Sequence, residues 1–502
     1  MAPHDDLTPE ADYEATVRAA ARRRLRVLAA LVCALGVALV LSREGAAIAA
    51  WTRGETDLRG HRRYAPRHPV DRAALRRVDF ARVHAQLLPR WLVALQRADT
   101  PAGNRRAVEA LAALRRAIAP DRNLDAIVTE LDARVRDDLA GNSARVRYLL
   151  WAWGAYLDRA GVPYRVEGTV LRRRWRASLR FRAYRVLDDA PVAVGARAYR
   201  ARLLRRVDGT NLREADLGHA GEADEGALVV IDTVFRMAAD EVWPMLDAAD
   251  DVHRAPLERA HAVAVRAEAA SVLSPDDYAR LARTAHARFV MVNAASAINA
   301  RSWCSAVPAI GHVPWWGYAP ELAARARAVA AEPPEDPDCP PMLPEEAEDF
   351  ATGSLAVRAE AGLDRSLTAL VTWLARAVTV HEVRHVADDW EVDGLRTPLA
   401  CDDCPRALGT SGRAELAAYL ASFATPGVGR VSFFQACRAA GGGVGPHGAA
   451  LRVANKEVGA CLAPPRDLYG MARRAERALF GRATTVTLPP ARFVAGLVPT
   501  RR

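Results

Sequence analysis

Five consecutive residues, His381-Glu382-Val383-Arg384-His385, have the types and spacing needed to hold a metal ion and activate water. Residues four apart lie on one face of a helix, so His381 and His385 can direct both imidazoles at one ion. Glu382 lies beside that face, where its carboxylate can accept a proton from water. The pattern therefore predicts a metal site that serves hydrolysis.

The residues before this motif predict the helix that must carry it. Apolar residues recur at three- and four-residue spacing, as on the buried face of an amphipathic helix, and the stripe continues through His381 and His385. Gly394 and Pro398 are expected to end the helix. The alternative is a helix whose two histidines are merely buried or solvated. The residues of the stripe are Leu367, Leu370, Val371, Leu374 and Val378.

A catalytic zinc ion needs a third protein ligand and one open position for water. We expect Glu415 to be that ligand. It opens a second predicted helix, 415–424, which is bounded by Thr410-Ser411-Gly412 before it and by Pro426-Gly427 after it.

These two segments together resemble the gluzincin branch of the zincin metallopeptidases. In that branch HExxH is followed some tens of residues later by a helix with Glu in a Glu-x-x-Ala-type context, which Glu415-Leu416-Ala417-Ala418 matches. The resemblance covers about 367–424. It implies His381, His385 and Glu415 as ligands of Zn²⁺, and Glu382 as the general base. Arg384 departs from the pattern, because the residues between Glu and the second His are usually uncharged, but it can face away from the metal.

Glu391 is a rival third ligand. It stands where the extended HExxHxxGxxH pattern places its last ligand, but Asp388 occupies the position of the glycine that turns the chain. Asp388 and Asp389 are alternatively acceptors for a ligand imidazole N–H, or solvated acids at the end of the helix. The helix around Glu415 favours that residue over Glu391.

A developing oxyanion needs a further hydrogen-bond donor, for which the candidates are Tyr419 and His447. Tyr419 shares a helix face with Glu415, and His447 lies in the glycine-rich stretch 441–448. The simpler interpretations are a packed helix residue for Tyr419 and a loop histidine for His447.

An apolar run at Val27–Ser42 follows five arginines, which predicts an N-terminus in the cytoplasm and export of the rest of the chain. We expect this run to be an uncleaved, single-pass membrane anchor. A cleaved signal peptide is the alternative, because Ala47-Ile48-Ala49 resembles a cleavage site. Both interpretations place the metal site in the periplasm or outside the cell.

Cysteine usage agrees with export. Six cysteines remain outside the apolar run, an even number that suits disulfides in an oxidising compartment. Cys401-Asp402-Asp403-Cys404 has redox or metal-binding spacing, but without a second pair a structural disulfide is the better interpretation. The six are Cys304, Cys339, Cys401, Cys404, Cys437 and Cys461.

The charge of the chain, +10 at neutral pH, does not indicate nucleic-acid binding. Its basic residues are scattered arginines, and Lys456 is the only lysine. At 502 residues the chain is long enough for two or three domains.

We expect an α+β protein, mainly α, with a zincin-like metallopeptidase domain on its C-terminal side. A helical region and a small antiparallel β element precede that domain. Val, Arg, Tyr and Phe alternate over 164–207, with breaks at Gly168, Pro191 and Gly195, and helical patterns resume over 227–246 and 274–300. The predicted parts are a cytoplasmic tail (1–26), the anchor (27–42), a juxtamembrane spacer (43–73), a helical region (74–163), a mixed α/β region (164–331), a Pro/acidic linker (332–346) and the zincin-like domain (347–502).

The sequence thus predicts a membrane-anchored, extracytoplasmic zinc metallopeptidase that cleaves a protein or peptide substrate through a metal-activated water. One alternative is a non-catalytic, zincin-like envelope scaffold, and another is a metal-dependent hydrolase of a different substrate. The intact Glu382 argues against the scaffold, because only catalysis needs that carboxylate.

Overall fold

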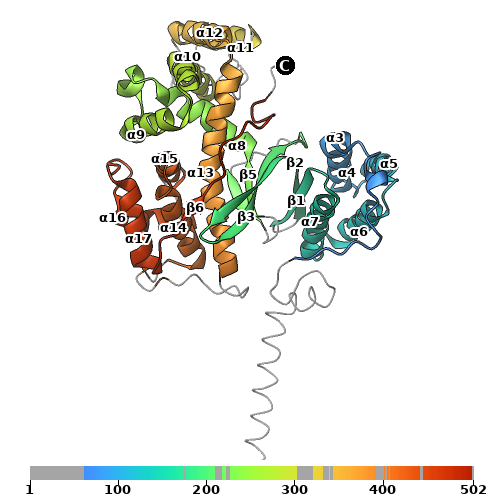
Figure 1. The fold of residues 1–502 in the computed structure, drawn as a ribbon. Coiled ribbons are helices and arrows are strands. Elements are labelled where there is room, and N and C mark those ends of the chain that lie inside the picture. Colours follow the sequence, from blue (N-terminus) through green and yellow to red (C-terminus); the bar gives the residue numbers. More distant parts are fainter. Residues whose placement is uncertain are drawn as a thin grey trace, which may run out of the picture. The chain divides into compact units, whose positions relative to one another are not determined.

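The computed structural model describes residues 62–173, 176–209, 217–221, 226–301, 320–331, 338–339, 343–391, 401, 404–405, 408–440 and 445–499. The chain divides into two compact units, Met1–Ala65 and Pro66–Arg502, and the second contains all the helices and strands described here by residue range. It is mostly helical with one mixed sheet, which agrees with the predicted α+β class (Figure 1). The finer division into domains stays a prediction.

The N-terminal part is helical, as predicted for 74–163. Pro101 begins one of its helices, where Thr100 caps the first turn, and Asp121 caps the next helix through its side chain. Gly161, with φ of 76°, ends the last one in a left-handed conformation. The elements are α2 (Arg72–Leu75), α3 (Phe80–Arg82), the π-helix η1 (Val83–Leu87), α4 (Leu88–Leu95), α5 (Pro101–Ile118), α6 (Arg122–Asp138) and α7 (Ser143–Ala160).

The sheet begins with the predicted antiparallel meander. Gly195 makes the turn between its second and third strands, but Gly168 and Pro191 lie inside strands and do not break them. The strands are β1 (Tyr164–Arg173), β2 (Arg176–Val194), β3 (Arg197–Arg206), β4 (Gly218–Ala220), β5 (Ala227–Val230) and the short β6 (Val486–Thr487).

The strand order is β1-β2-β3-β5-β4, with β6 paired to β2. β5 is parallel to β3, with Ala201 opposite Ala227, and β4 is antiparallel to β5. The helix predicted from residue 227 is therefore wrong over its first four residues. All four side chains of β5 are fully buried, so the segment has no polar positions from which a strand could be recognised.

The remaining helices follow the sheet in the chain. One of them, α12, begins inside the range that the sequence predicts as a linker. They are α8 (Ile231–Met237), the π-helix η2 (Ala238–Val242), the 3₁₀ helices η3 (Pro244–Leu246) and η4 (Ala249–His253), α9 (Pro256–Val272), α10 (Pro275–Arg301), α11 (Pro320–Ala331), α12 (Pro344–Ala359), α13 (Leu363–Glu391), α14 (Thr410–Phe423), α15 (Gly429–Ala440), α16 (Pro446–Val458) and α17 (Leu468–Phe480).

The long helix α13 occupies the centre of the largest hydrophobic core. It contacts β3, β4 and β5 as well as α8, α10, α14 and α15, and Figure 1 shows it between the sheet and the C-terminal helices. A second core joins α14, α15, α16 and α17. The predicted metal motif is thus carried by the most extensively packed helix of the described chain.

Within the described residues we find no helix long and apolar enough to cross a membrane. The predicted anchor at Val27–Ser42 lies outside those residues.

Candidate metal centre

The helix that carries the motif forms as predicted. Leu367, Leu370, Val371, Leu374 and Val378 all lie in the core, so the apolar stripe is buried. On the continuation of that stripe, the next two turns present the motif histidines. The positions of Gly394 and Pro398, expected to end the helix, lie outside the described residues.

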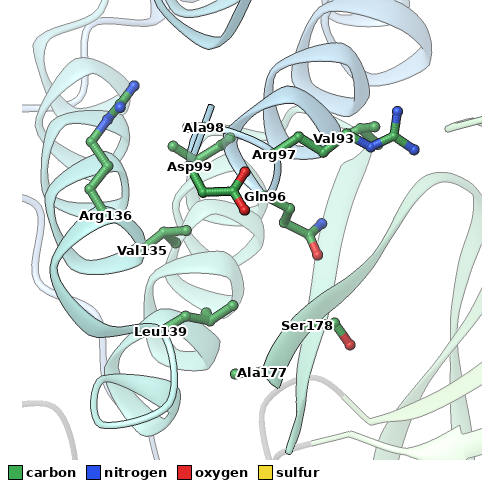
Figure 2. A pocket seen from close by; sticks show the side chains of 11 residues that line it. Val93, Gln96, Arg97, Ala98, Asp99, Val135, Arg136, Leu139, Ala177 and Ser178 are labelled. Atoms are coloured by element: carbon green, nitrogen blue, oxygen red, sulfur yellow. The ribbon is translucent and has the colours of Figure 1, made fainter. Parts of the chain in front are cut away.

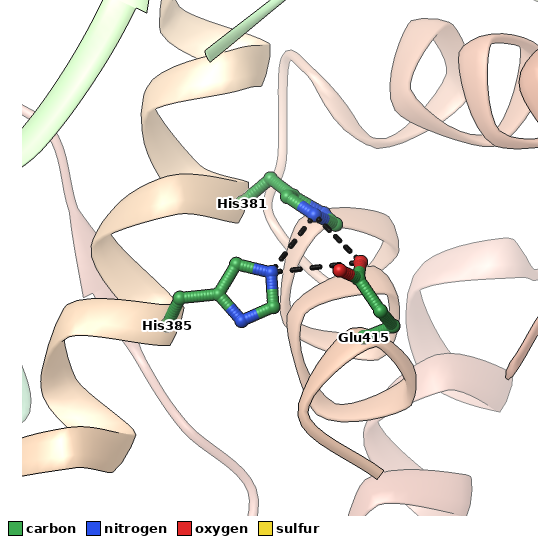
Figure 3. Close-up of side chains that lie close together, drawn as sticks. All are labelled: His381, His385 and Glu415. Atoms are coloured by element: carbon green, nitrogen blue, oxygen red, sulfur yellow. Dashed lines mark hydrogen bonds and ion pairs between the residues drawn. The ribbon is translucent and has the colours of Figure 1, made fainter. Parts of the chain in front are cut away.

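Glu415 reaches the two histidines from α14. This helix begins at Thr410, one turn earlier than predicted, and packs on α13 with Leu416 and Leu420 fully buried. His381 Nε2 lies 3.2 Å from Glu415 Oε2, and His385 Nε2 lies 3.5 Å from the same oxygen. The two Nε2 atoms are 3.2 Å apart. Figure 3 shows the three side chains converging from the two helices.

This geometry fits a tetrahedral zinc ion. Ligand atoms about 2.0–2.2 Å from one tetrahedral centre are roughly 3.3 Å from each other, close to the three separations found here. Oε2 of Glu415 is buried and accepts no hydrogen bond of regular geometry in the described structure, although nitrogens surround it. Two imidazoles and one carboxylate are also a donor set that zinc accepts, with a fourth position left for water.

The charges of these groups depend strongly on each other. Burial raises the pKa of Glu415, but His381, His385 and His447 outweigh it and hold that pKa well below its usual range. Burial lowers the pKa of His385, whereas Glu415 raises it more, so the net shift is upward. An anionic carboxylate therefore faces the two imidazoles, and a metal ion bound there would have to displace any proton on the ligand nitrogens.

The structure brings both predicted oxyanion donors to the same place. His447 Nδ1 lies 3.0 Å from Glu415 Oε2, and the Tyr419 hydroxyl lies 3.0 Å from the same nitrogen. Burial, together with the charges of Glu415 and Glu382, raises the pKa of Tyr419 above its usual range. Tyr419 therefore keeps its proton at neutral pH and can donate it in a hydrogen bond.

Glu382 is buried and lines a cavity of about 270 Å³ with His381, Tyr419 and His447. The remaining lining is largely apolar and comes from α13, α14, α15 and the start of β4. These residues are Leu217, Gly218, Ala377, Val378, Ser422, Ser432, Gln435, Ala436 and Ala439. A largely apolar cavity thus adjoins the candidate metal-ligand cluster.

Gly218 is a site residue that the sequence did not reveal. A methyl group at this position would lie 2.9 Å from Cγ of Glu382 and 2.8 Å from the backbone oxygen of Leu228. Glycine therefore allows the strand β4 to approach the side chain of the predicted general base. Its signal in the sequence, an isolated glycine, is too common to have identified it.

His219 adds a second unforeseen group near Glu382. Its Nε2 lies 3.1 Å from Oε1 of Glu167 on β1. Burial lowers the pKa of His219, but Glu167 outweighs it and, with a smaller contribution from Glu382, raises the pKa overall. The neighbourhood of Glu382 therefore contains an imidazole that is more readily protonated than a free histidine.

Arg384 pairs with two carboxylates outside the group His381, His385 and Glu415. It is fully buried, with its guanidinium 3.0 Å from Asp388 of the same helix and 3.8 Å from Glu476 of α17. The charge that departs from the HExxH pattern is thus matched by two carboxylates, one on α13 itself and one on α17. The pairing also gives Asp388 a partner other than a ligand imidazole.

The remaining predicted residues are the rival ligand Glu391 and the cysteines. Glu391 is the last residue of α13, but its side chain lies outside the described part. Cys401 and Cys404 form a disulfide, as do Cys437 and Cys461 on the C-terminal helices. Cys339 is disulfide-bonded as well.

A larger cavity, of about 750 Å³, lies between α4, α6 and the beginning of β2. Figure 2 shows its lining, in which Arg97, Asp99 and Arg136 are the charged residues. None of its lining residues is a histidine or a cysteine. The larger cavity therefore offers no imidazole or thiol to a metal ion, whereas the smaller cavity beside α13 is lined by His381, Glu382 and His447.

Comparison of the chain with protein-family models, curated proteins and solved structures finds no match.

Proposed function

We propose that this chain is a membrane-anchored, extracytoplasmic zinc-dependent peptidase. One observation carries the proposal: ligand atoms of His381, His385 and Glu415 all lie within 4.8 Å of one another, beside a cavity that Glu382 lines. A carboxylate adjacent to such a cluster, but outside it, is what hydrolysis through an activated water requires.

Each residue of the site has a chemical part in this proposal. His381, His385 and Glu415 would hold zinc, which when bound would acidify a water molecule and polarise a substrate carbonyl. Glu382 accepts the proton of the attacking water and passes it to the leaving amine. Tyr419, which stays protonated, and His447 donate hydrogen bonds to the oxyanion.

A peptide is the substrate class that the surroundings favour. β4 ends the strand order of the described sheet, so one of its edges pairs with no other strand of that part of the chain. Leu217, directly before β4, and Gly218, its first residue, line the same cavity as Glu382. An extended peptide could add to this edge by backbone hydrogen bonds, with one side chain in the cavity.

The disulfides support an oxidising compartment. The pairs Cys401–Cys404 and Cys437–Cys461 belong to the same hydrophobic core as Tyr419, and such bonds are rare in reducing cytosol. Together with the predicted anchor, they favour a site outside the cytoplasm. The anchor would hold the candidate site near a membrane surface, where envelope proteins would be accessible as substrates.

The experiment that tests this function combines zinc content with turnover. We expect Glu382→Gln to retain zinc but to cleave a mixed peptide library at least about 10²-fold more slowly than the parent, because an amide cannot accept the proton of water. His381→Ala should instead lose both zinc and activity. Glu457→Gln, an exposed residue of α16, is the matched control and should behave like the parent.

The outcomes separate the proposal from its alternatives. Absence of zinc from parent protein prepared without chelator would contradict the metal site. A zinc-loaded parent without activity on the library would favour the scaffold or a different substrate. An active parent with an equally active Glu382→Gln variant would exclude the proposed chemistry.

A further inference from the structure

A second group of metal-ligand side chains lies outside the α13 site. Asp247 follows η3, Asp250 lies in η4, and His286 lies on α10. One ligand atom from each of the three lies within 4.8 Å of the other two. His286 Nδ1 and Asp250 Oδ1 are 2.8 Å apart. None of these residues contributes to the cavity or the metal cluster described above.

Asp250 is the unusual member of this group. Its side chain is only 4% exposed, and its second oxygen, Oδ2, is buried without a hydrogen-bond partner in the described structure. An ionised carboxylate is strongly penalised in such a position unless a cation compensates it. Its other oxygen, Oδ1, contacts Nδ1 of His286, so the carboxylate borders the cluster.

Nearby arginines do not supply that compensation. Arg254 and Arg266 both form ion pairs with Asp251, at 3.3 Å and 2.6 Å. In the described structure neither Asp247 nor Asp250 has an arginine within ion-pair distance. Asp247 is close enough to Arg266 to raise its pKa, so the buried Asp250 is the carboxylate that no arginine compensates within ion-pair distance in the described structure.

A protonated His286 would compensate only part of this charge. Its side chain is 62% exposed, so its interaction with Asp250 is weakened by solvent. A divalent ion would contact both carboxylates as well as the imidazole nitrogen. Imidazole and carboxylates together suit borderline ions such as Zn²⁺, whereas Mg²⁺ and Ca²⁺ prefer oxygen ligands alone.

We propose that Asp247, Asp250 and His286 form a second metal site that binds a divalent transition-metal ion and fixes the η4 turn to α10. The site is structural in this proposal: it joins two elements that are about 36 residues apart in sequence, as the separation of Asp250 and His286 shows. It does not depend on the peptidase function, because it shares no residue with the α13 centre.

The test uses the full chain with both motif histidines replaced, His381→Ala and His385→Ala, so that the first site is removed. Equilibrium dialysis against Zn²⁺ should still give about one bound equivalent, and Zn²⁺ should raise the midpoint of thermal unfolding. Co²⁺ should give visible absorption bands that Zn²⁺ abolishes. Mg²⁺ and Ca²⁺ should not compete.

Two further substitutions locate the ion. His286→Ala and Asp250→Asn, each in that background, should abolish Zn²⁺ binding, the Co²⁺ bands and the thermal shift. His253→Ala is the matched control, since it removes an exposed imidazole of the same turn and should change none of these.

Several results would overturn the proposal. A background protein that binds no Zn²⁺ would do so, as would Zn²⁺ binding that persists in both His286→Ala and Asp250→Asn. If His286→Ala lowers the unfolding midpoint while Zn²⁺ has no effect on the background protein, the pair is a simple ion pair and not a metal site.

Discussion

Replacement of Arg384 by methionine tests how the motif helix is held in the core. Arg384 and Glu476 are both 0% exposed, and Asp388 is 7% exposed. Methionine fills the space with an unbranched apolar side chain, but it leaves the carboxylates of Asp388 and Glu476 without the buried guanidinium. Removal of one partner from a buried pair costs about 3–5 kcal/mol of unfolding free energy, and we expect a loss of that size near neutral pH.

The pH dependence of this loss gives the prediction a second readout. Burial raises the pKa of Glu476, and Arg384 is one of the groups that oppose this rise. Without Arg384 the pKa should rise further, so the folded variant holds a proton that the unfolded chain releases above its ordinary carboxyl pKa. Stability of the variant should therefore fall, relative to the parent, as pH increases from about 5 to about 8.

Urea unfolding followed by circular dichroism measures both effects. The matched control is Arg474→Met on α17, which breaks an ion pair with Asp467 whose side chains are 67% and 63% exposed, and its cost should be far smaller than that of Arg384→Met. The double variant Arg384→Met, Asp388→Asn should recover part of the loss. The reasoning would be refuted if Arg384→Met cost no more than the control, or if its cost were the same at both pH values.

Three further predictions concern other parts of the chain. Burial lowers the pKa of His84 from 6.5 to about 4, so between these pH values only the unfolded chain takes up a proton. The unfolding free energy, measured by urea titration, should therefore fall by about 3 kcal/mol as the pH decreases from about 6.5 to about 4. Gly218→Ala should retain zinc but lower peptidase turnover by roughly 10²-fold, because its methyl group displaces Glu382. Loss of the Cys437–Cys461 bond, by replacement of both with serine, should cost about 3 kcal/mol in urea unfolding for a 24-residue separation.

Each of these has a control. His84→Gln should remove the loss of stability in that pH range, and a loss of equal size in the variant would assign it to other groups. Gly409→Ala, where a methyl group meets open space, should leave turnover unchanged. The serine variant should unfold at the same urea concentration as the parent in excess reductant, and a difference there would point to packing rather than to the disulfide.

Local periodicity made the motif helix and the meander predictable. Two residues four apart on a helix share a face whatever the rest of the chain does, so the spacing of His381 and His385 already implied convergence of their imidazoles. The alternation of β1, β2 and β3 works in the same way, because a half-buried strand needs side chains of different polarity on its two faces. The strand breaks predicted at Gly168 and Pro191 were wrong, because both residues lie inside paired strands.

β5 shows where periodicity fails. Ala227, Leu228, Val229 and Val230 are buried on both faces, so their order carries no alternation. A short apolar run of this kind is compatible with a helix or a strand, and only its parallel pairing with β3 decided between them.

The complete site required the tertiary structure. Packing of α14 on α13 brings Glu415 to the histidines, and His447 arrives from α16. Glu476, which compensates Arg384, comes from α17. The sequence by itself determined the helix, its two imidazoles and the adjacent carboxylate, because a single helical repeat fixes them. The proposed third ligand, the proposed oxyanion donors and Gly218 come from other elements than α13, and their approach to it depends on how whole faces pack.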